Sequence, residues 1–213
     1  MTTQTATPRL FSSADINALF APPHPRRSSV EVYEDSRAIL IDKRLATAEM
    51  FDGFAKRLPP DGVPFLLRPP QPRSLNTLDW ADLMARLQLN GKTGKNFLTV
   101  KSLSDLDPII TVPRMLIGLE DGRGRLNTKP SVSEKAITTA GRFGYNLWTG
   151  YIHAVVYTEV LNHHYLDLVR SRYDSDYVPY LYLDGDEPAL DASGDAYAHP
   201  KWGAPSFGSV IEG

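Results

Sequence analysis

The sequence predicts an α+β fold: a single domain with a small mixed or antiparallel sheet packed by helices, preceded by an N-terminal arm. Short apolar runs with strand character are interspersed with amphipathic segments, without the regular βαβ spacing of a doubly wound sheet. A proline-rich stretch, Ala21 to Arg27, cannot continue a helix and separates the first residues from the rest. We therefore predict an arm, residues 1–28, and a globular domain, residues 29–213.

Composition limits the classes of protein. An apolar fraction of 42% suffices for a core, and the net charge of -2 argues against a nucleic-acid binder. We expect no membrane span, because no apolar run approaches about eighteen residues, and no secretory signal. The absence of cysteine excludes disulfides, thiolate nucleophiles and Cys-ligated zinc. These features predict a cytoplasmic protein.

The first half of the domain should contain helices and strands in irregular order. We expect a helical region at residues 31–58 in one or two pieces and a helix at 78–89 that Asn90-Gly91 closes. The expected strands are 63–67, 97–100 and 114–119.

Two helices are predicted in the second half. Ser131 and Glu134 have the spacing of a capping box, so a helix should run to about Arg142. Asn146 should cap the next helix, residues 147–162.

The stretch from Ser171 to Trp202 is the most strongly patterned. A strand beginning at Pro179 should bury Leu181 and Leu183 and place Tyr180 and Tyr182 on the opposite face. Asp184-Gly185-Asp186 should turn the chain into a short return segment. Seven acids and no base lie between Arg172 and Lys201, so this surface should be acidic.

The arm carries its own apolar group. Ser13 can cap a short helix that places Ile16, Leu19 and Phe20 on one face, with Phe11 just before it. Such a short helix is marginal alone, and helix-in-groove docking uses this spacing. We expect the arm to bind a protein partner or a second copy of the chain; the alternative is that it completes its own core.

No cofactor or metal site is predicted. The phosphate-loop pattern fails because Arg86 stands where a glycine is needed before Gly91-Lys92-Thr93. A calcium loop fails because Pro188 offers no side-chain oxygen two residues after Asp186.

Candidate ligand-binding residues are polar or aromatic and lie in the second half of the chain. Arg172 is the first choice, since a guanidinium binds carboxylates bidentately, either an anionic ligand or its neighbours Asp174 and Asp176. His153 and Tyr157 are one helical turn apart and could face a shared pocket. The full set is Arg172, His153, Tyr157, His164 and Trp202.

One sequence pattern resembles a known family. It comprises Ser171-Arg172, Val178-Pro179-x-Leu181-x-Leu183-x-Gly185-x-x-Pro188-x-Leu190 and the element Trp202-Gly203-Ala204-Pro205-Ser206. It resembles the C-terminal block of an uncharacterised bacterial family known only as a domain of unknown function, and the likeness covers roughly residues 63–206. Tyr151-Ile152 stands where that family has a Glu-Gly pair, and its frequent cysteines are absent here. The resemblance implies no particular chemistry.

The sequence favours a non-catalytic binding or interaction protein with an N-terminal docking segment. The alternative is a small enzyme with a polar pocket around His163, His164, Asp167 and Arg172, with or without a metal. A weaker third hypothesis is a nucleic-acid accessory factor that uses a basic group, namely Arg114, Arg123, Arg125 and Lys129. The sequence leaves open whether the protein is an enzyme.

Overall fold

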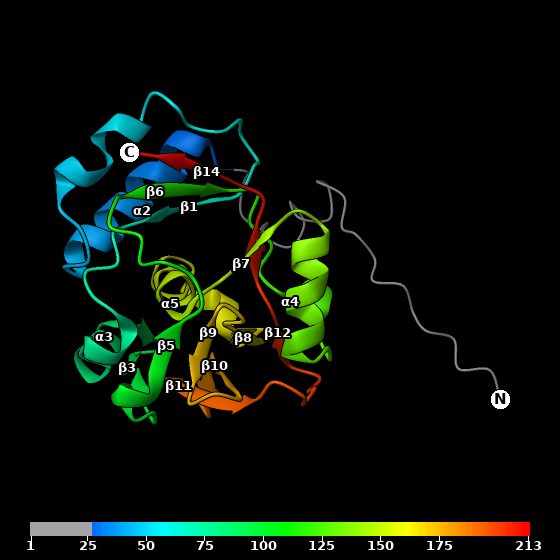
Figure 1. The fold of residues 1–213 in the computed structure, drawn as a ribbon. Helices are drawn as coiled ribbons and strands as arrows, with labels where there is room; N and C mark the ends of the chain where they lie inside the picture. The colour runs from blue at the N-terminus through cyan, green and yellow to red at the C-terminus, as the bar shows by residue number, and fades with distance from the viewer. Residues whose placement is uncertain (1–26) are drawn as a thin grey trace.

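Helix α5 (Leu147–Val156) lies between two sheets. The computed structural model describes residues 27–213 and confirms the α+β class. Figure 1 shows α5 near the centre, with a three-stranded sheet above it and a larger sheet below. The apolar residues of the arm, Phe11, Ile16, Leu19 and Phe20, lie outside the described residues.

The smaller sheet has the order β1-β6-β14, and both pairings are antiparallel. Its strands are β1 (Phe65–Arg68), β6 (Arg114–Ile117) and β14 (Ser209–Glu212). Helix α2 (Ser29–Asp42) packs against β1 and α5, and the 3-10 helix η1 (Ala48–Phe54) follows it. Ser28 caps α2, because its Oγ accepts the Glu31 N–H at 3.2 Å while the Glu31 carboxylate accepts the Ser28 N–H at 2.7 Å.

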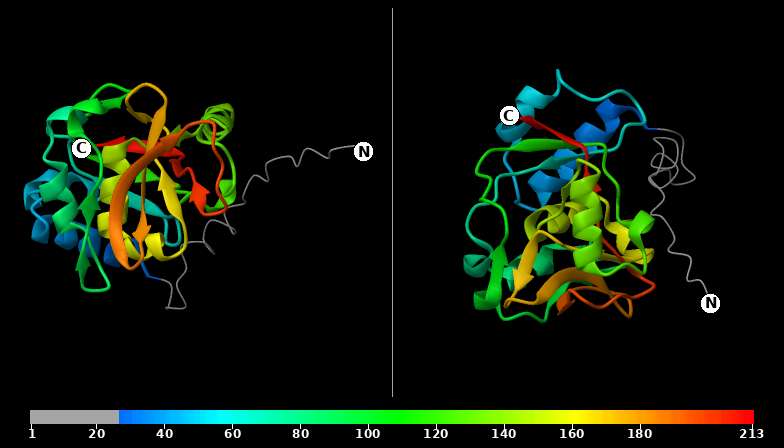
Figure 2. Two further views of the ribbon diagram at one scale, coloured as in Figure 1. Left: turned by 90° about the horizontal axis from the view of Figure 1, so that it is seen from below. Right: turned by 45° about the vertical axis from the view of Figure 1, so that its right-hand side comes forward.

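The larger sheet has the order β12-β8-β10-β11-β4, and β9 joins β5 to β10. The strands are β4 (Lys95–Asn96), β5 (Leu103–Asp105), β8 (Tyr165–Asp167), β9 (Ser171–Tyr173), β10 (Tyr177–Asp184), β11 (Glu187–Gly194) and β12 (Trp202–Gly203). Strands β10 and β11 form the predicted hairpin, whose register pairs Asp184 with Glu187. In the view from below in Figure 2, this hairpin lies in front of the rest of the fold.

Shorter elements connect these layers. Strand β13 (Ser206–Phe207) pairs with β7 (Phe143–Gly144), and β2 (Gln88–Leu89) pairs with β3 (Lys92–Thr93). The remaining helices are α3 (Trp80–Arg86), α4 (Pro130–Thr139) and the 3-10 turns η2 (Leu75–Thr77), η3 (Val100–Ser102), η4 (Arg123–Arg125) and η5 (Thr158–Asn162).

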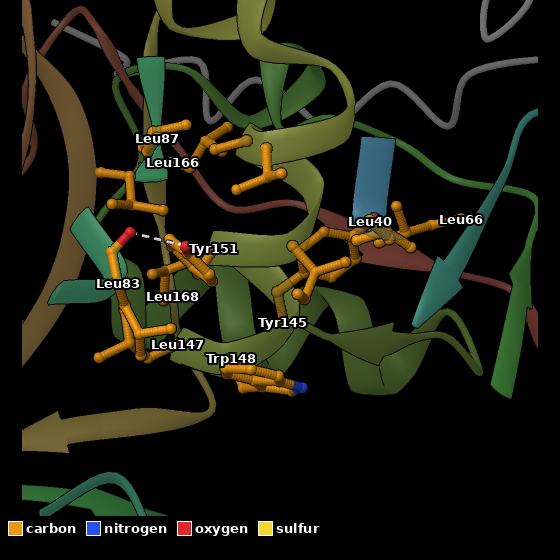
Figure 3. Packing of buried hydrophobic residues seen from close by; sticks show 14 of the residues in the cluster. Leu40, Leu66, Leu83, Leu87, Tyr145, Leu147, Trp148, Tyr151, Leu166 and Leu168 are labelled. Carbon is orange, nitrogen blue, oxygen red and sulfur yellow. Dashed lines mark hydrogen bonds between the residues drawn. The ribbon is translucent and has the colours of Figure 1, made fainter. Parts of the chain in front are cut away.

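Helix α5 is buried along nearly its whole length. Every residue from Leu147 to Val155 is buried, as a helix that is apolar all round requires. The predicted Asn146 cap is confirmed: its Oδ1 accepts the Thr149 N–H at 2.9 Å. Figure 3 shows the surrounding side chains, including Tyr151, whose hydroxyl donates to the Leu83 carbonyl at 2.7 Å.

Several predicted elements are wrong in detail. Asn90 and Gly91 do not end a helix; both have positive φ and form the tight turn between β2 and β3. Residues 97–100 form no strand, because the Asn96 side chain bonds both the N–H and the C=O of Leu98. The helix expected from residue 78 to 89 spans only α3.

Two further predictions are wrong: the capping box of Ser131 and Glu134, and the start of a strand at Pro179. Helix α4 begins before Ser131: Pro130 is its first residue, and Lys129 precedes it without a side-chain cap bond. Glu134 pairs instead with Arg170 and Arg172. Pro179 lies inside β10 rather than at its start. Its missing N–H is tolerated there because it falls where the neighbouring strand changes from β9 to β8.

Leu181→Ala should lower the free energy of unfolding by roughly 2–5 kcal/mol, because Leu181 is fully buried beneath the larger sheet. Urea denaturation measures the change. Leu106→Ala is the matched control, since Leu106 is 44% exposed, and it should cost less than about 0.5 kcal/mol. Equal losses in both variants would contradict the assigned face of β10.

Candidate functional site

The outer face of the larger sheet carries a cluster of aromatic rings. Successive side chains of a strand point to opposite faces, so Leu181 faces the core while Tyr180 and Tyr182 point outward. Leu183, also predicted to be buried, is only partly buried because it lies at the end of β10. Register places Trp202 of β12 beside Tyr165 of β8. With the loop residue His199 these rings form what we call the aromatic surface: Tyr165, Tyr180, Tyr182, His199 and Trp202.

The rings of the aromatic surface pack closely. Tyr165 lies between Tyr180 and His199, with both centroid separations 5.9 Å and interplanar angles of 5° and 16°. Trp202 joins the same group, 5.2 Å from Tyr180 and 5.3 Å from His199. His199 is exposed and the other four rings are partly exposed. Such rings offer a large contact area at a small cost in side-chain entropy.

A hollow adjoins the aromatic surface. Its volume is about 160 Å³, smaller than the roughly 300–1,000 Å³ of sites that enclose a drug-sized ligand, so it suits part of a ligand. Tyr165 and Lys201 belong to it, and the Lys201 ammonium lies 6.0 Å from the Tyr165 ring centroid. The lining residues are Leu161, Asn162, His163, His164, Tyr165, Leu183, Gly185 and Lys201.

The two predicted histidines of this region differ in environment. His163 is exposed, whereas His164 is only 1% exposed and its Nε2 lies 2.7 Å from the Asp121 carbonyl oxygen. Nε2 therefore carries the hydrogen and donates it, and Nδ1 keeps a lone pair that is enclosed without a partner. Burial lowers the pKa of His164, which favours this neutral form.

Asp167 lies at the edge of the aromatic surface. It pairs with Tyr180 across β8 and β10, is 1% exposed, and leaves Oδ2 without a hydrogen-bond partner. Burial raises the pKa of its carboxyl to about 7. A proton can therefore be held or released here near neutral pH.

Asp167→Asn should stabilise the protein above pH 7, and the gain should vanish as the pH falls towards 4. The folded pKa is raised from 3.8 to about 7, so only the folded state binds the proton between these values. The penalty for the buried carboxylate is therefore complete above pH 7, on the order of 4 kcal/mol. Urea denaturation at pH 4.5 and 8 measures the difference from the wild type.

Asp176→Asn serves as the control for that experiment, because Asp176 is exposed. As a substitution at an exposed site, it should change the free energy of unfolding by less than about 0.5 kcal/mol. A constant difference for Asp167→Asn at both pH values would show that its carboxyl does not titrate in this range.

Arg172 is fixed within the protein. Its guanidinium donates to the carbonyls of Val169 at 2.8 Å and Ser171 at 2.9 Å, and Nη2 lies 3.0 Å from the Glu134 carboxylate. Its carboxylate partner is thus on α4 rather than at Asp174 or Asp176, because the chain brings α4 across β9. The guanidinium fork holds that junction.

Arg172→Lys should destabilise the protein by roughly 1–3 kcal/mol, because an ammonium cannot replace three bonds from a planar fork. Thermal melting measures the loss, with the exposed Arg73→Lys as control. Unchanged melting combined with lost ligand binding would assign Arg172 to a binding site instead.

His153 and Tyr157 lie together, as their spacing predicts, but in the interior. Their ring centroids are 5.2 Å apart. His153 Nδ1 lies 3.1 Å from the Tyr145 hydroxyl, and Tyr157 donates to the Phe65 carbonyl at 2.6 Å. Burial lowers the pKa of His153 to about 4, so it is neutral at physiological pH. Neither residue lines the hollow.

Among the residues predicted for a polar pocket, the structure brings His163 and His164 into one hollow and leaves Asp167 and Arg172 outside its lining. Trp202 lies on the aromatic surface. The sequence analysis missed Tyr165, Lys201 and His199. The period of two in β8, which places Tyr165 and Asp167 on one face, is the signal that points to Tyr165.

The predicted basic group is neutralised in part by nearby carboxylates. Arg114 pairs with Glu212, Arg123 with Asp121, and Arg125 with Glu120. Between residues 27 and 213, no three His, Asp or Glu side chains are grouped so that they could hold a metal ion. No helix in the same range is long and apolar enough to cross a membrane.

Comparison with known proteins gives no relative. No family model matches the chain, and no curated protein or solved structure matches it. The assignment of function therefore depends on the site itself.

Proposed function

We propose that the protein is a non-catalytic binding protein whose ligand lies on the aromatic surface and reaches into the hollow. The observation that carries this proposal is the continuity of the two features: Tyr165 belongs to both, and Lys201 lies beside its ring. Half-exposed rings next to a polar recess suit a ligand with a flat ring and hydrogen-bonding groups.

The polar groups of the hollow define the ligand further. The exposed His163 imidazole has ring nitrogens that can donate or accept a hydrogen bond, whereas the Lys201 ammonium can only donate. A ligand with hydroxyl groups, which both donate and accept, matches this mixture. Asp184 and Asp186, exposed on either side of Gly185, disfavour a polyanion. A neutral sugar or nucleoside is the ligand class that these groups favour.

The enzyme hypothesis receives less support. Of its four residues, only His163 and His164 meet in the hollow, and Arg172 is bound to Glu134. The arm stays part of our proposal: Phe11, Ile16, Leu19 and Phe20 would dock onto a protein partner or a second copy. Membership of the uncharacterised bacterial family, suggested by the pattern at residues 171–206, likewise remains a prediction.

Titration of the full-length protein with monosaccharides and neutral nucleosides should shift the NMR signals of Tyr165, Tyr182, Lys201 and the Trp202 indole. Trp202→Ala should weaken binding at least about tenfold, since interface tryptophans often contribute more than 1.4 kcal/mol. Phe97→Ala is the control, because Phe97 is an exposed aromatic residue that lies outside the aromatic surface. Shifts confined to another face, or turnover of the ligand, would contradict the proposal.

A further inference from the structure

The chain carries a proline-rich sequence immediately before the described residues. Pro22-Pro23-His24-Pro25 is followed by Arg26, so two prolines stand three positions apart with a base next to them. Such sequences favour the polyproline II conformation, which loses little entropy on binding. Domains that bind them do so through exposed tyrosine and tryptophan rings.

The aromatic surface has the composition that such a segment requires. Three tyrosines and a tryptophan lie side by side with ring centroids 5.0–5.9 Å apart, and all four rings are partly exposed. Proline rings can pack against these rings without a deep pocket, so the modest volume of the hollow is no obstacle.

The charges of the two parts are complementary. Asp184 and Asp186 are exposed at the hairpin turn, two and four residues beyond Tyr182, and Asp191 is partly exposed opposite Tyr180. The proline-rich segment contains the basic residues His24 and Arg26. Lys201 lies beside the Tyr165 ring, so the arginine should point towards Asp184 and Asp186 rather than towards Lys201.

Helix α2, which follows the segment in the sequence, and the aromatic surface lie on opposite sides of α5. Arg27 precedes α2, which packs against β1 and α5, whereas the aromatic rings face away from α5. Figures 1 and 2 show α2 and the β10–β11 hairpin at opposite ends of the domain. Pro22 is five residues from Arg27 and so spans at most about 18 Å of extended chain, less than two packed layers of about 10 Å each.

We infer that the aromatic surface of each chain binds the Pro22–Arg26 segment of a second copy, so that two chains associate by exchanging these segments. This inference rests on the proposed function in one respect: both assign binding to the aromatic surface. Once one segment is bound, the second binds within the pair at a high effective concentration, so two small contacts suffice.

The test measures association of the full-length protein by sedimentation velocity over a range of concentrations. The wild type should form dimers, and they should weaken as salt is added. Pro22→Ala/Pro25→Ala and Trp202→Ala should each weaken dimerisation about tenfold or more. Pro8→Ala, in the same arm, should leave it unchanged. Asp184→Asn/Asp186→Asn tests the same surface at exposed positions, in case Trp202→Ala fails to fold.

A mixture of the two defective proteins gives a sharper outcome. Trp202→Ala retains its segment and Pro22→Ala/Pro25→Ala retains its aromatic surface, so together they can form one intact contact. The mixture should therefore associate more strongly than either variant alone. The peptide of residues 21–27 should compete with this association and change the fluorescence of Trp202, whereas Trp80 and Trp148 are buried.

Three results would overturn the inference. A wild type that stays monomeric while the proline variant alters Trp202 fluorescence would place the segment on its own chain. Loss of dimers only when Phe11 and Phe20 are changed to Ser would assign association to the apolar helix of the arm. Dimers that none of these changes weakens would show that the arm takes no part in dimerisation. Binding of monosaccharides and nucleosides is measured separately. A protein that binds them but does not dimerise would contradict this inference and leave the proposed function intact.

Discussion

The fold depends on the burial of α5 on all sides. A helix with apolar residues around its whole circumference gains stability only when other elements cover every face. The smaller sheet, α2, α3 and the larger sheet supply that cover, and the contact is close: a Cβ on Gly150 would lie 2.1 Å from a methyl carbon of Leu168. Only glycine allows the helix to approach the segment after β8.

The first turn of α5 is buried, so its polar groups need hydrogen-bond partners within the protein. Segments distant in the sequence supply these partners. The Leu147 N–H donates to Ser171 Oγ at 2.8 Å, and Asn146 Nδ2 donates to the Asp105 carboxylate at 3.1 Å. Arg68 donates from Nε to Thr149 at 3.0 Å, and burial lowers its pKa to about 10. Strands β1, β5 and β9 are thereby tied to one helix end, and both sheets take their positions from it.

Local features were predictable where short-range physics decides them. Asn146 caps its helix and Asp184-Gly185-Asp186 turns its hairpin, because neighbouring residues supply every atom involved. Asn90-Gly91 fits either a helix end or a hairpin turn, and only the pairing of β2 with β3 decides between them. The candidate site was predictable in part: Trp202 and His164 stood out, but His199 and Tyr165 meet only through tertiary structure.

Glu134 illustrates why side-chain partners are harder to predict than elements. Its position relative to Ser131 suits a cap, yet Arg170 and Arg172 offer it two charge-assisted contacts. Because α4 begins at Pro130, Ser131 lies inside the first turn rather than at the cap, and the Glu134 carboxylate binds the two guanidinium groups. The sequence shows the helix but not the arginines that cross it.

The same reasoning bears on the aromatic surface. The inner face of the larger sheet packs against α5. The side chains on its outer face are therefore not needed to form the core. Asp167 there is buried with Oδ2 unpaired and a pKa raised to about 7, which costs stability that an uncharged residue would not. Proteins tolerate such local costs mainly where a site needs them. An unfavourable carboxyl beside four half-exposed rings is therefore easier to explain as part of a binding surface than as packing.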